Sequence, residues 1–167
     1  AVDCNQDYLV IVTAGSHEIH VIDRSAMHDV LAESGTISVE DMVADLTLSQ
    51  RFTQRKALYA EGGRSLVLVG NTAFIPGYFS ETVDMWNVAG GKPEPAGQIV
   101  LHAGEEPTPQ DAVRKGEESF CDATELCLGK WQSCHSCHPF ARSDAFKWDL
   151  ENDGLGNFKN DKSLLYS

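Results

Sequence analysis

The stretch WQSCHSCHPF, residues 131–140, places two cysteines and two histidines between Cys134 and His138. Its order, C-x-x-C-H, is the attachment motif of c-type haem. The thiols of Cys134 and Cys137 would add across the two vinyl groups of one porphyrin. The imidazole of His138 would then lie beneath the iron as its proximal ligand. The sequence therefore predicts one haem c, with Cys134, Cys137 and His138 as cofactor-binding residues and His138 as the iron ligand.

Other chemistry of the same side chains stays open at this stage. A structural zinc site is one alternative, although only its last pair has tight spacing, and its ligands would be Cys121, Cys127, Cys134 and Cys137. A thioredoxin-like C-x-x-C would need a preceding apolar strand, which the residues before Cys134 do not show. A plain disulfide within the motif would leave His138 unexplained. We expect His135, between the two thiols, to be a surface residue and not an iron ligand.

Composition and charge limit the classes of function. The chain has 167 residues, of which 42% are hydrophobic, as in an ordinary globular protein of one domain or two small ones. Its net charge of -12 and its scattered lysines and arginines argue against nucleic acid as a partner. No apolar run reaches the length of a membrane span. The chain begins without Met or a signal-peptide layout, so we expect a mature or excised piece.

The cysteine content indicates the compartment. Five cysteines are many for a reducing cytosol, and haem c is attached outside the cytoplasm, so we predict a periplasmic or otherwise extracytoplasmic protein. Once haem takes two thiols, Cys121 and Cys127 are close enough in sequence to form a disulfide. Cys4 is then left as a free thiol or as half of a pair outside the chain.

Alternating hydrophobicity predicts β-hairpins before residue 105. In YLVIVTAGSHEIHVIDRS, residues 8–25, an apolar strand leads through a turn to a second strand. In that second strand Ile19 and Val21 face one way, and His20 and Ile22 face the other. The second hairpin is expected to contain a strand Leu66–Val69, a turn region Pro76–Ser80 and a strand Thr82–Val88.

The two hairpins form an imperfect repeat. Aligning Asp23 with Asn87 sets them 64 residues apart, more than the about 40 to 50 residues of usual propeller repeats. We therefore interpret residues 31–63 as an inserted surface loop, helical at most over 39–46 and without chemistry of its own. A strand Gln98–His102 follows. Prolines then mark a linker, and a helix containing Ala112–Ser119 is expected, with Asp111 as its cap.

Longer stretches of the sequence resemble known families. LVIVTAGSHEIHVID and, more loosely, LVLVGNTAFIPGYFSETVDMWNV resemble repeats of YVTN-type β-propellers. AVRKGEESF, the haem motif and WDLENDGLGNFKNDKSLL resemble the N-terminal haem region of the bacterial di-haem cytochrome c peroxidase and MauG superfamily, in members fused to such a propeller. The chain departs from the family at Phe140, where an acidic residue is frequent, and does not contain the family's second C-x-x-C-H.

The resemblance implies a fold and an activity. The fold would be mixed, with incomplete antiparallel β-propeller blades over residues 1–104, followed by a small, mostly α-helical and incomplete cytochrome c-type haem domain over 105–167. The function would be that of a haem oxidoreductase in peroxide reduction or electron transfer, with a redox partner protein or a second haem domain as partner. The alternative is a mono-haem electron carrier with a propeller docking surface and no catalysis. No catalytic acid or base can be named.

Three further interpretations concern particular side chains. Asp149, Glu151 and Asp153 resemble the first half of a calcium loop, but Asn160 stands where a bidentate Glu belongs, so calcium is a weak expectation. Trp131 and Trp148 flank the haem motif and are expected to pack. Structural roles are expected for the remaining histidines, which are His17, His20, His28 and His102.

Overall fold

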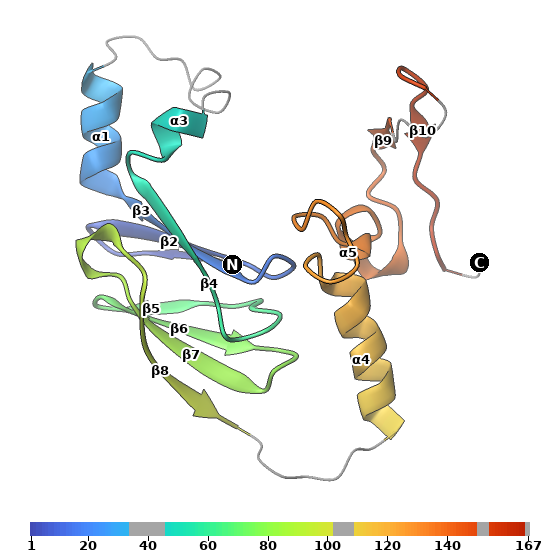
Figure 1. Cartoon of the computed structure of the whole chain (residues 1–167), viewed down its shortest axis with the longest axis horizontal. Helices are drawn as coiled ribbons and strands as arrows, with labels where there is room; N and C mark the ends of the chain where they lie inside the picture. The colour runs from blue at the N-terminus through green and yellow to red at the C-terminus, as the bar shows by residue number, and fades with distance from the viewer. Residues whose placement is uncertain (34–45, 102–108, 150–153, 166–167) are drawn as a thin grey trace. The chain divides into compact units, whose positions relative to one another are not determined.

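The computed structural model describes residues 1–33, 46–101, 109–149 and 154–165 (Figure 1). The chain divides into two compact units, Ala1–Thr108 and Pro109–Ser167, whereas the sequence led us to expect a division between residues 104 and 105. Within the described ranges no helix combines the length and the apolar character that crossing a membrane requires.

The N-terminal unit contains two four-stranded antiparallel sheets, each with its strands in chain order (Figure 1). The strands of the first sheet are β1 (Val2–Cys4), β2 (Tyr8–Thr13), β3 (Glu18–Asp23) and β4 (Thr53–Ala57). The strands of the second sheet are β5 (Val67–Val69), β6 (Thr72–Gly77), β7 (Thr82–Asn87) and β8 (Glu94–Val100). In the described part of the chain these sheets do not close a ring.

The internal repeat is confirmed, with one correction. Strands β2 and β6 begin and end 64 residues apart, and so do β3 and β7, as the alignment of Asp23 with Asn87 predicts. The apparent match between LVIV and LVLV is wrong, because the first lies in β2 and the second contributes β5, the first strand of its sheet. Short apolar runs look alike wherever a strand contacts the core, so they do not fix strand order.

The predicted surface loop over residues 31–63 is also partly wrong. It contains strand β4, which pairs with β3 and completes the first sheet. Helices α1 (Arg24–Glu33) and α3 (Leu46–Ser49) lie between β3 and β4, whereas only the short turn η1 (Ala89–Gly91) separates β7 from β8. The additional residues of the first repeat therefore lie between its third and fourth strands. Most of the helix expected over 39–46 falls outside the described residues.

In the second sheet, the predicted turn at Pro76 and the predicted start of the last strand are wrong. Pro76 was assigned to a turn but lies in β6, opposite Val83 of β7. Strand β5 reaches only as far as Phe74, so at Pro76 no ladder with β5 is interrupted. Strand β8 starts at Glu94, earlier than the predicted Gln98, and accommodates a bulge opposite Met85 and Trp86. Its predicted end at His102 lies outside the described residues.

The hydrophobic core lies between the two sheets. As predicted, Ile19 and Val21 share one face of β3, and both are fully buried. Alternate residues of each sheet meet in this core because successive side chains of a strand point to opposite faces. The core residues of the strands and their flanks are Val10, Val12, Ile19, Val21, Leu58, Leu66, Ala73, Ile75, Trp86 and Val88.

The two sheets contact each other through non-equivalent faces. In β7 the buried residues include Asp84 and Trp86, which the 64-residue offset matches to His20 and Ile22 on the outer face of β3. The core residues Ile19 and Val21 correspond in turn to Val83 and Met85, which are only partly buried. The contacting face of the first sheet therefore corresponds, in the repeat, to the outer face of the second sheet. We call this arrangement head-to-tail stacking; in a symmetric sandwich, equivalent faces would meet.

Asp84 is a fully buried carboxylate in this core. It accepts hydrogen bonds from the backbone N–H groups of Tyr59 (2.9 Å) and Ala60 (2.8 Å). It also accepts from Nε2 of Gln98 (2.8 Å) and Nε1 of Trp86 (3.3 Å). Because its oxygens are well supplied with donors, this buried charge ties the connection after β4 to the second sheet.

The C-terminal unit contains one long helix. Helix α4 (Pro109–Cys121) confirms the helix predicted over 112–119, and Asp111 lies in its first turn, not before it. The single turn α5 (Cys134–Cys137) and the 3₁₀ turn η2 (Pro139–Ala141) follow. Strands β9 (Lys147–Trp148) and β10 (Lys159–Asn160) form a short antiparallel pair that the sequence analysis did not predict. The described part is thus less helical than expected.

Candidate haem-binding site

The haem motif forms a single capped turn of helix. Ser133 is its N-cap, and a capping box links the Ser133 and Ser136 side chains to the backbone at the start of α5. The backbone N–H of His138 donates to the carbonyl of Cys134 at 2.9 Å and ends the turn. Residues three apart share a helix face, so the turn places the thiols of Cys134 and Cys137 on one side.

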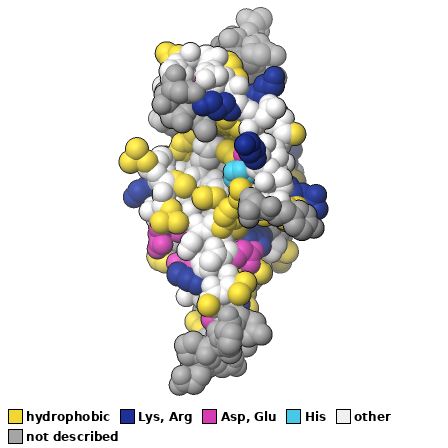
Figure 2. All heavy atoms as spheres, turned by 90° about the vertical axis from the view of Figure 1, so that its right-hand side faces the viewer, with side chains coloured by type: hydrophobic (Ala, Val, Ile, Leu, Met, Phe, Trp, Pro, Cys, Tyr) yellow, Lys and Arg dark blue, Asp and Glu magenta, His cyan; other side chains and the backbone are white. Residues whose placement is uncertain are grey.

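Both thiols and the His138 imidazole line the same groove, which has a volume of about 420 Å³. The rest of its described lining comes from Cys127, Leu128, Gly129, Trp131, Gln132 and Ser133. Leu128 and Trp131 are apolar yet strongly exposed, at 104% and 71%. Figure 2 shows that exposed hydrophobic side chains occur at several places on the viewed face of the molecule. The groove therefore combines two thiols, an imidazole and apolar walls.

His138 makes two contacts through its ring. Its Nδ1 lies 3.2 Å from the carbonyl oxygen of Arg142, and a proton on Nδ1 makes this contact a hydrogen bond. That arrangement orients the ring and assigns Nε2 as the nitrogen for a metal. Nε2 itself lies 3.2 Å from Oδ1 of Asp161. The sequence analysis identified His138 but not Asp161, and no motif in the sequence indicates this carboxylate.

The chain folds back to bring Asp161 to the motif. Lys159 pairs with Trp148 across β9 and β10, and the N–H of Leu164 donates to the carbonyl of Ala141 at 2.9 Å. The residues that follow the motif are also attached to it, because the N–H of Asp144 donates to the carbonyl of Cys137 at 3.0 Å. Asp161 therefore sits between two backbone attachments to the part of the chain around the haem motif.

The Cys137 thiol is kept in its protonated form. Burial raises the pKa of Cys137, and the nearby carboxylates of Asp144 and Asp161 raise it further. Gln132 opposes this shift through a hydrogen bond from its Nε2 to the sulfur, at 3.3 Å. The net result is a raised pKa and a thiol whose position is fixed by Gln132.

The other cysteines do not form the sites considered from sequence. Cys4 is exposed, and in this structure neither Cys121 nor Cys127 takes part in a disulfide, so the pairing considered between them is not formed. Among the residues that the structure describes, no three His, Cys, Asp or Glu side chains are grouped to hold a metal ion. The alternative of four cysteines around zinc therefore receives no support from the geometry.

His135, which we expected at the surface, is partly exposed and also packs against aromatic side chains. Its ring lies edge-on between two aromatic side chains, with centroid distances of 6.2 Å to Phe120 and 5.7 Å to Phe140. This cluster ties the haem-motif turn to the end of α4. Phe140 itself is 82% exposed and has φ 55°, an unusual backbone conformation for a residue other than glycine.

The two tryptophans that flank the motif differ in their surroundings. Trp131 lines the groove and is mostly exposed, so it does not pack as expected in the described structure. Trp148 is half-buried and donates from Nε1 to Oδ2 of Asp144 at 2.8 Å. Asp149 accepts a hydrogen bond from the N–H of Gly156 at 2.6 Å. Glu151 and Asp153 lie outside the described residues, so calcium stays a prediction.

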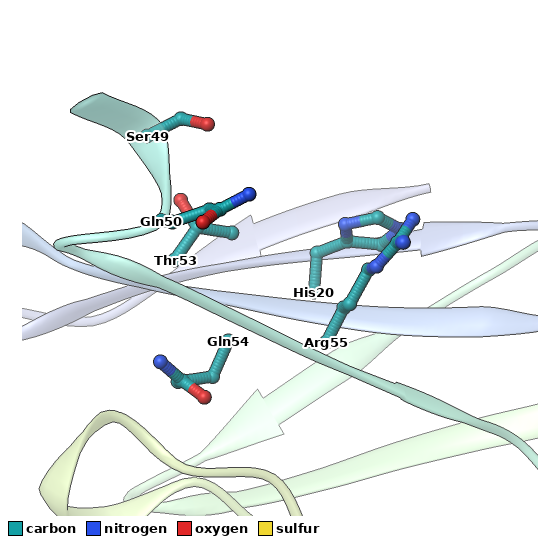
Figure 3. A pocket seen from close by; sticks show the side chains of 6 residues that line it. All are labelled: His20, Ser49, Gln50, Thr53, Gln54 and Arg55. Atoms are coloured by element: carbon teal, nitrogen blue, oxygen red, sulfur yellow. The ribbon is translucent and has the colours of Figure 1, made fainter. Parts of the chain in front are cut away.

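The larger groove of about 630 Å³ lies in the N-terminal unit at strand β4 (Figure 3). His20 and Arg55 point to one side of β4 and Gln54 to the other, so the groove extends around an edge strand. Glu18 is close to both side chains, 3.4 Å from Nε2 of His20 and 3.8 Å from Nη1 of Arg55. We assign no chemistry to this groove.

The remaining histidines were expected to be structural. Nδ1 of His17 accepts a hydrogen bond from the N–H of Gly62 at 3.1 Å, which confirms a structural contact for this residue. His28 lies in helix α1, and His102 lies outside the described residues.

Comparisons of the chain with protein-family models, with curated proteins and with solved structures each found no match. The functional argument therefore depends on the haem motif and on the groove that its side chains line.

Proposed function

We propose that the C-terminal unit binds one haem c covalently, through thioether bonds from Cys134 and Cys137, with His138 as the iron ligand. One observation carries the proposal: the two thiols and the imidazole line one groove whose walls include exposed Leu128 and Trp131. A porphyrin in this groove would cover apolar surface that otherwise contacts water. Bound haem would supply one-electron redox chemistry at its iron.

The chain's own residues would fix the ligands of the cofactor. The Arg142 carbonyl holds the Nδ1 side of the His138 ring, which sets the tautomer with Nε2 available for iron. Gln132 positions the Cys137 sulfur, and the Ser133 cap begins the turn that spaces the thiols. Leu128 and Trp131 would exclude water from the porphyrin edge.

The redox role follows as part of the same proposal. The resemblance to the di-haem peroxidase and MauG superfamily favours an extracytoplasmic oxidoreductase that works with a redox partner or a second haem domain. Peroxide cleavage also needs an acid or base near the open iron position. Among the described residues that line the groove, none is Asp or Glu, and His138 is the one histidine. This observation favours the alternative of a mono-haem electron carrier as the second candidate.

Optical spectra of the full chain, matured in a host with cytochrome c assembly machinery, separate these functions. A partly high-spin ferric spectrum that changes when peroxide is added would support peroxide reduction. A low-spin spectrum without a response to peroxide would support the electron carrier. The control is a Cys134→Ser, Cys137→Ser double variant produced in the same host. If the unaltered chain and this variant are equally free of covalent haem, the proposed cofactor is wrong.

For the N-terminal unit, we propose that the two sheets are blades of an incomplete β-propeller. Their common strand order, the 64-residue offset and the head-to-tail stacking support this proposal. Head-to-tail stacking leaves the outer face of the second sheet for another blade. That face carries the apolar side chains of Phe74, Val83, Met85 and Ile99. A variant with Ile99→Lys should bind less of a hydrophobic dye than the unaltered chain, and equal binding would count against an exposed blade face.

A further inference from the structure

The contact between Asp161 and His138 lies at the atom that haem iron would need. Oδ1 of Asp161 is 3.2 Å from Nε2 of His138, and the two side chains are only 11% and 22% exposed. A histidine nitrogen holds a metal through its lone pair. With the carboxylate oxygen only 3.2 Å from this nitrogen, no iron atom can fit between the two atoms. The two arrangements therefore exclude each other.

Asp161 is held in place by its segment more than by its own hydrogen bonds. Its second oxygen, Oδ2, is buried and has no hydrogen-bond partner among the described residues. Such a buried acceptor without a donor costs free energy. The Leu164 to Ala141 backbone bond and the short pairing of β9 with β10 hold the segment instead.

The strand pairing of this segment is short, and conformationally permissive positions precede the segment. Gly154 and Gly156 have φ values of 105° and 86°, which glycine adopts without steric cost. Strand β10 pairs through only Lys159 and Asn160. A two-residue strand pair opens at a smaller free-energy cost than a longer strand in a larger sheet.

We propose that Asp161 covers the iron-binding nitrogen of His138, and that the segment Lys159–Leu164 must withdraw before haem iron can bind there. Asp161 is thus a positioning residue that slows haem uptake by acting on His138. The part of this inference that concerns haem uptake rests on the proposed haem function. The cover on Nε2 can be tested without any haem.

The first experiment measures how readily His138 reacts in the full chain prepared without haem. Diethylpyrocarbonate acylates an accessible imidazole nitrogen, and peptide mass spectrometry reports His138 and His135 separately. Loss of this close contact should make His138 of Asp161→Ala react roughly fivefold faster than in the unaltered chain. His135 contacts Phe120 and Phe140, so its rate should not change.

Asp144→Ala is the matched control. Asp144 and Asp161 both act on the Cys137 thiol, but only Asp161 contacts His138 in the described structure. The control should leave the rate of His138 unchanged. Equal His138 rates in Asp161→Ala and the unaltered chain would overturn the proposal. An equal rise of His135 and His138 would also overturn it, because the whole unit would then have opened.

The second experiment mixes the same haem-free proteins with ferrous haem and follows the spectrum of the histidine-ligated iron. Asp161→Ala should acquire it several-fold faster than the unaltered chain and than Asp144→Ala. Equal rates would overturn the slowing of haem uptake, even if His138 had become more reactive. If no protein acquired the spectrum, the proposed haem function would be wrong, while the first experiment would still decide whether Asp161 covers His138.

Discussion

The two units of the chain use apolar side chains in opposite ways. In the N-terminal unit, apolar side chains at alternate positions of the strands form a continuous core between the two sheets. In the described part of the C-terminal unit, the buried apolar residues are only Cys121 and Ala123. The same unit exposes many large apolar side chains, including Val113, Leu126, Leu128, Trp131, Phe140, Phe146, Leu155 and Phe158.

This difference shows what stabilises each unit. The N-terminal unit gains stability by removing apolar area from water. The C-terminal unit relies on local turns, caps and single backbone bonds such as that between Leu164 and Ala141. Domains of about 60 residues commonly need a metal, a disulfide or another additional element to be stable. A covalently bound haem would supply the apolar centre that the C-terminal unit lacks.

The largest expected effect follows from this contrast. Covalent haem should increase the hydrogen-exchange protection of peptides from α4 and α5 by about tenfold or more, because the unit gains a core. Peptides from β2 and β3 should exchange equally with and without haem. Exchange of the matured chain and of the Cys134→Ser, Cys137→Ser variant, followed by mass spectrometry, checks this. Equal protection of α4 and α5 in both proteins would remove the contrast between the units.

A core substitution tests the N-terminal half of the comparison. Trp86→Ala should lower the free energy of unfolding by about 3 to 5 kcal/mol, because the side chain is 1% exposed and lies in the core between the sheets. Denaturant unfolding measures the loss. The control is Val69→Ala, whose side chain is 62% exposed and should cost less than about 0.5 kcal/mol. Similar losses for the two variants would contradict the core assignment.

The buried carboxylate of the same core gives a smaller effect. The backbone donors of Tyr59 and Ala60 use Oδ2 of Asp84, whereas Gln98 uses Oδ1. Asp84→Asn replaces one of these oxygens by an NH₂ group, so one of the two sets of donors then faces another donor. We expect a loss of about 2 kcal/mol in the free energy of unfolding. Unfolding curves of Asp84→Asn and of Asp29→Asn, an exposed position in α1, provide the comparison. A neutral effect at Asp84 would show that its hydrogen bonds contribute little.

The smallest effect concerns the thiols of the motif. Because the pKa of Cys137 is raised, its reactive thiolate should appear at higher pH than that of an unperturbed thiol such as glutathione. Alkylation of Cys137 by iodoacetamide, followed by peptide mass spectrometry between about pH 7 and 10, measures this shift. Asp144→Asn should move the profile back toward lower pH. Coincident profiles for Cys137 and glutathione would contradict the combined effect of burial and the two carboxylates.

The sequence predicted those elements whose own residues determine them. Strands β2, β3 and β7 carry clear alternation, and α4 has a helical pattern after a proline-rich link. Strand β4 reads TQRKA and was missed, because charged residues suit an edge strand that only pairing with β3 reveals. Strand β6 was missed because Pro76 and Gly77 resemble a turn when the neighbouring strands are unknown.

The site was predictable to a similar extent. The spacing of Cys134, Cys137 and His138 determines their chemistry, so the motif could be recognised without a structure. The Asp161 contact could not, because it depends on the fold-back through β9 and β10. The contact of His135 with Phe120 likewise depends on how the motif turn meets the end of α4. Local spacing indicates the candidate ligands, whereas tertiary contacts determine which side chains lie next to them.

The most direct test of the haem proposal is the mass of one peptide. The full chain, matured in a host that attaches haem c and then digested, should yield the peptide containing Cys134, Cys137 and His138 with the mass of one haem added. The same peptide from the Cys134→Ser, Cys137→Ser variant should lack that mass. If the unaltered peptide from a host with working maturation carries two free thiols, the account of this unit as a haem protein is contradicted.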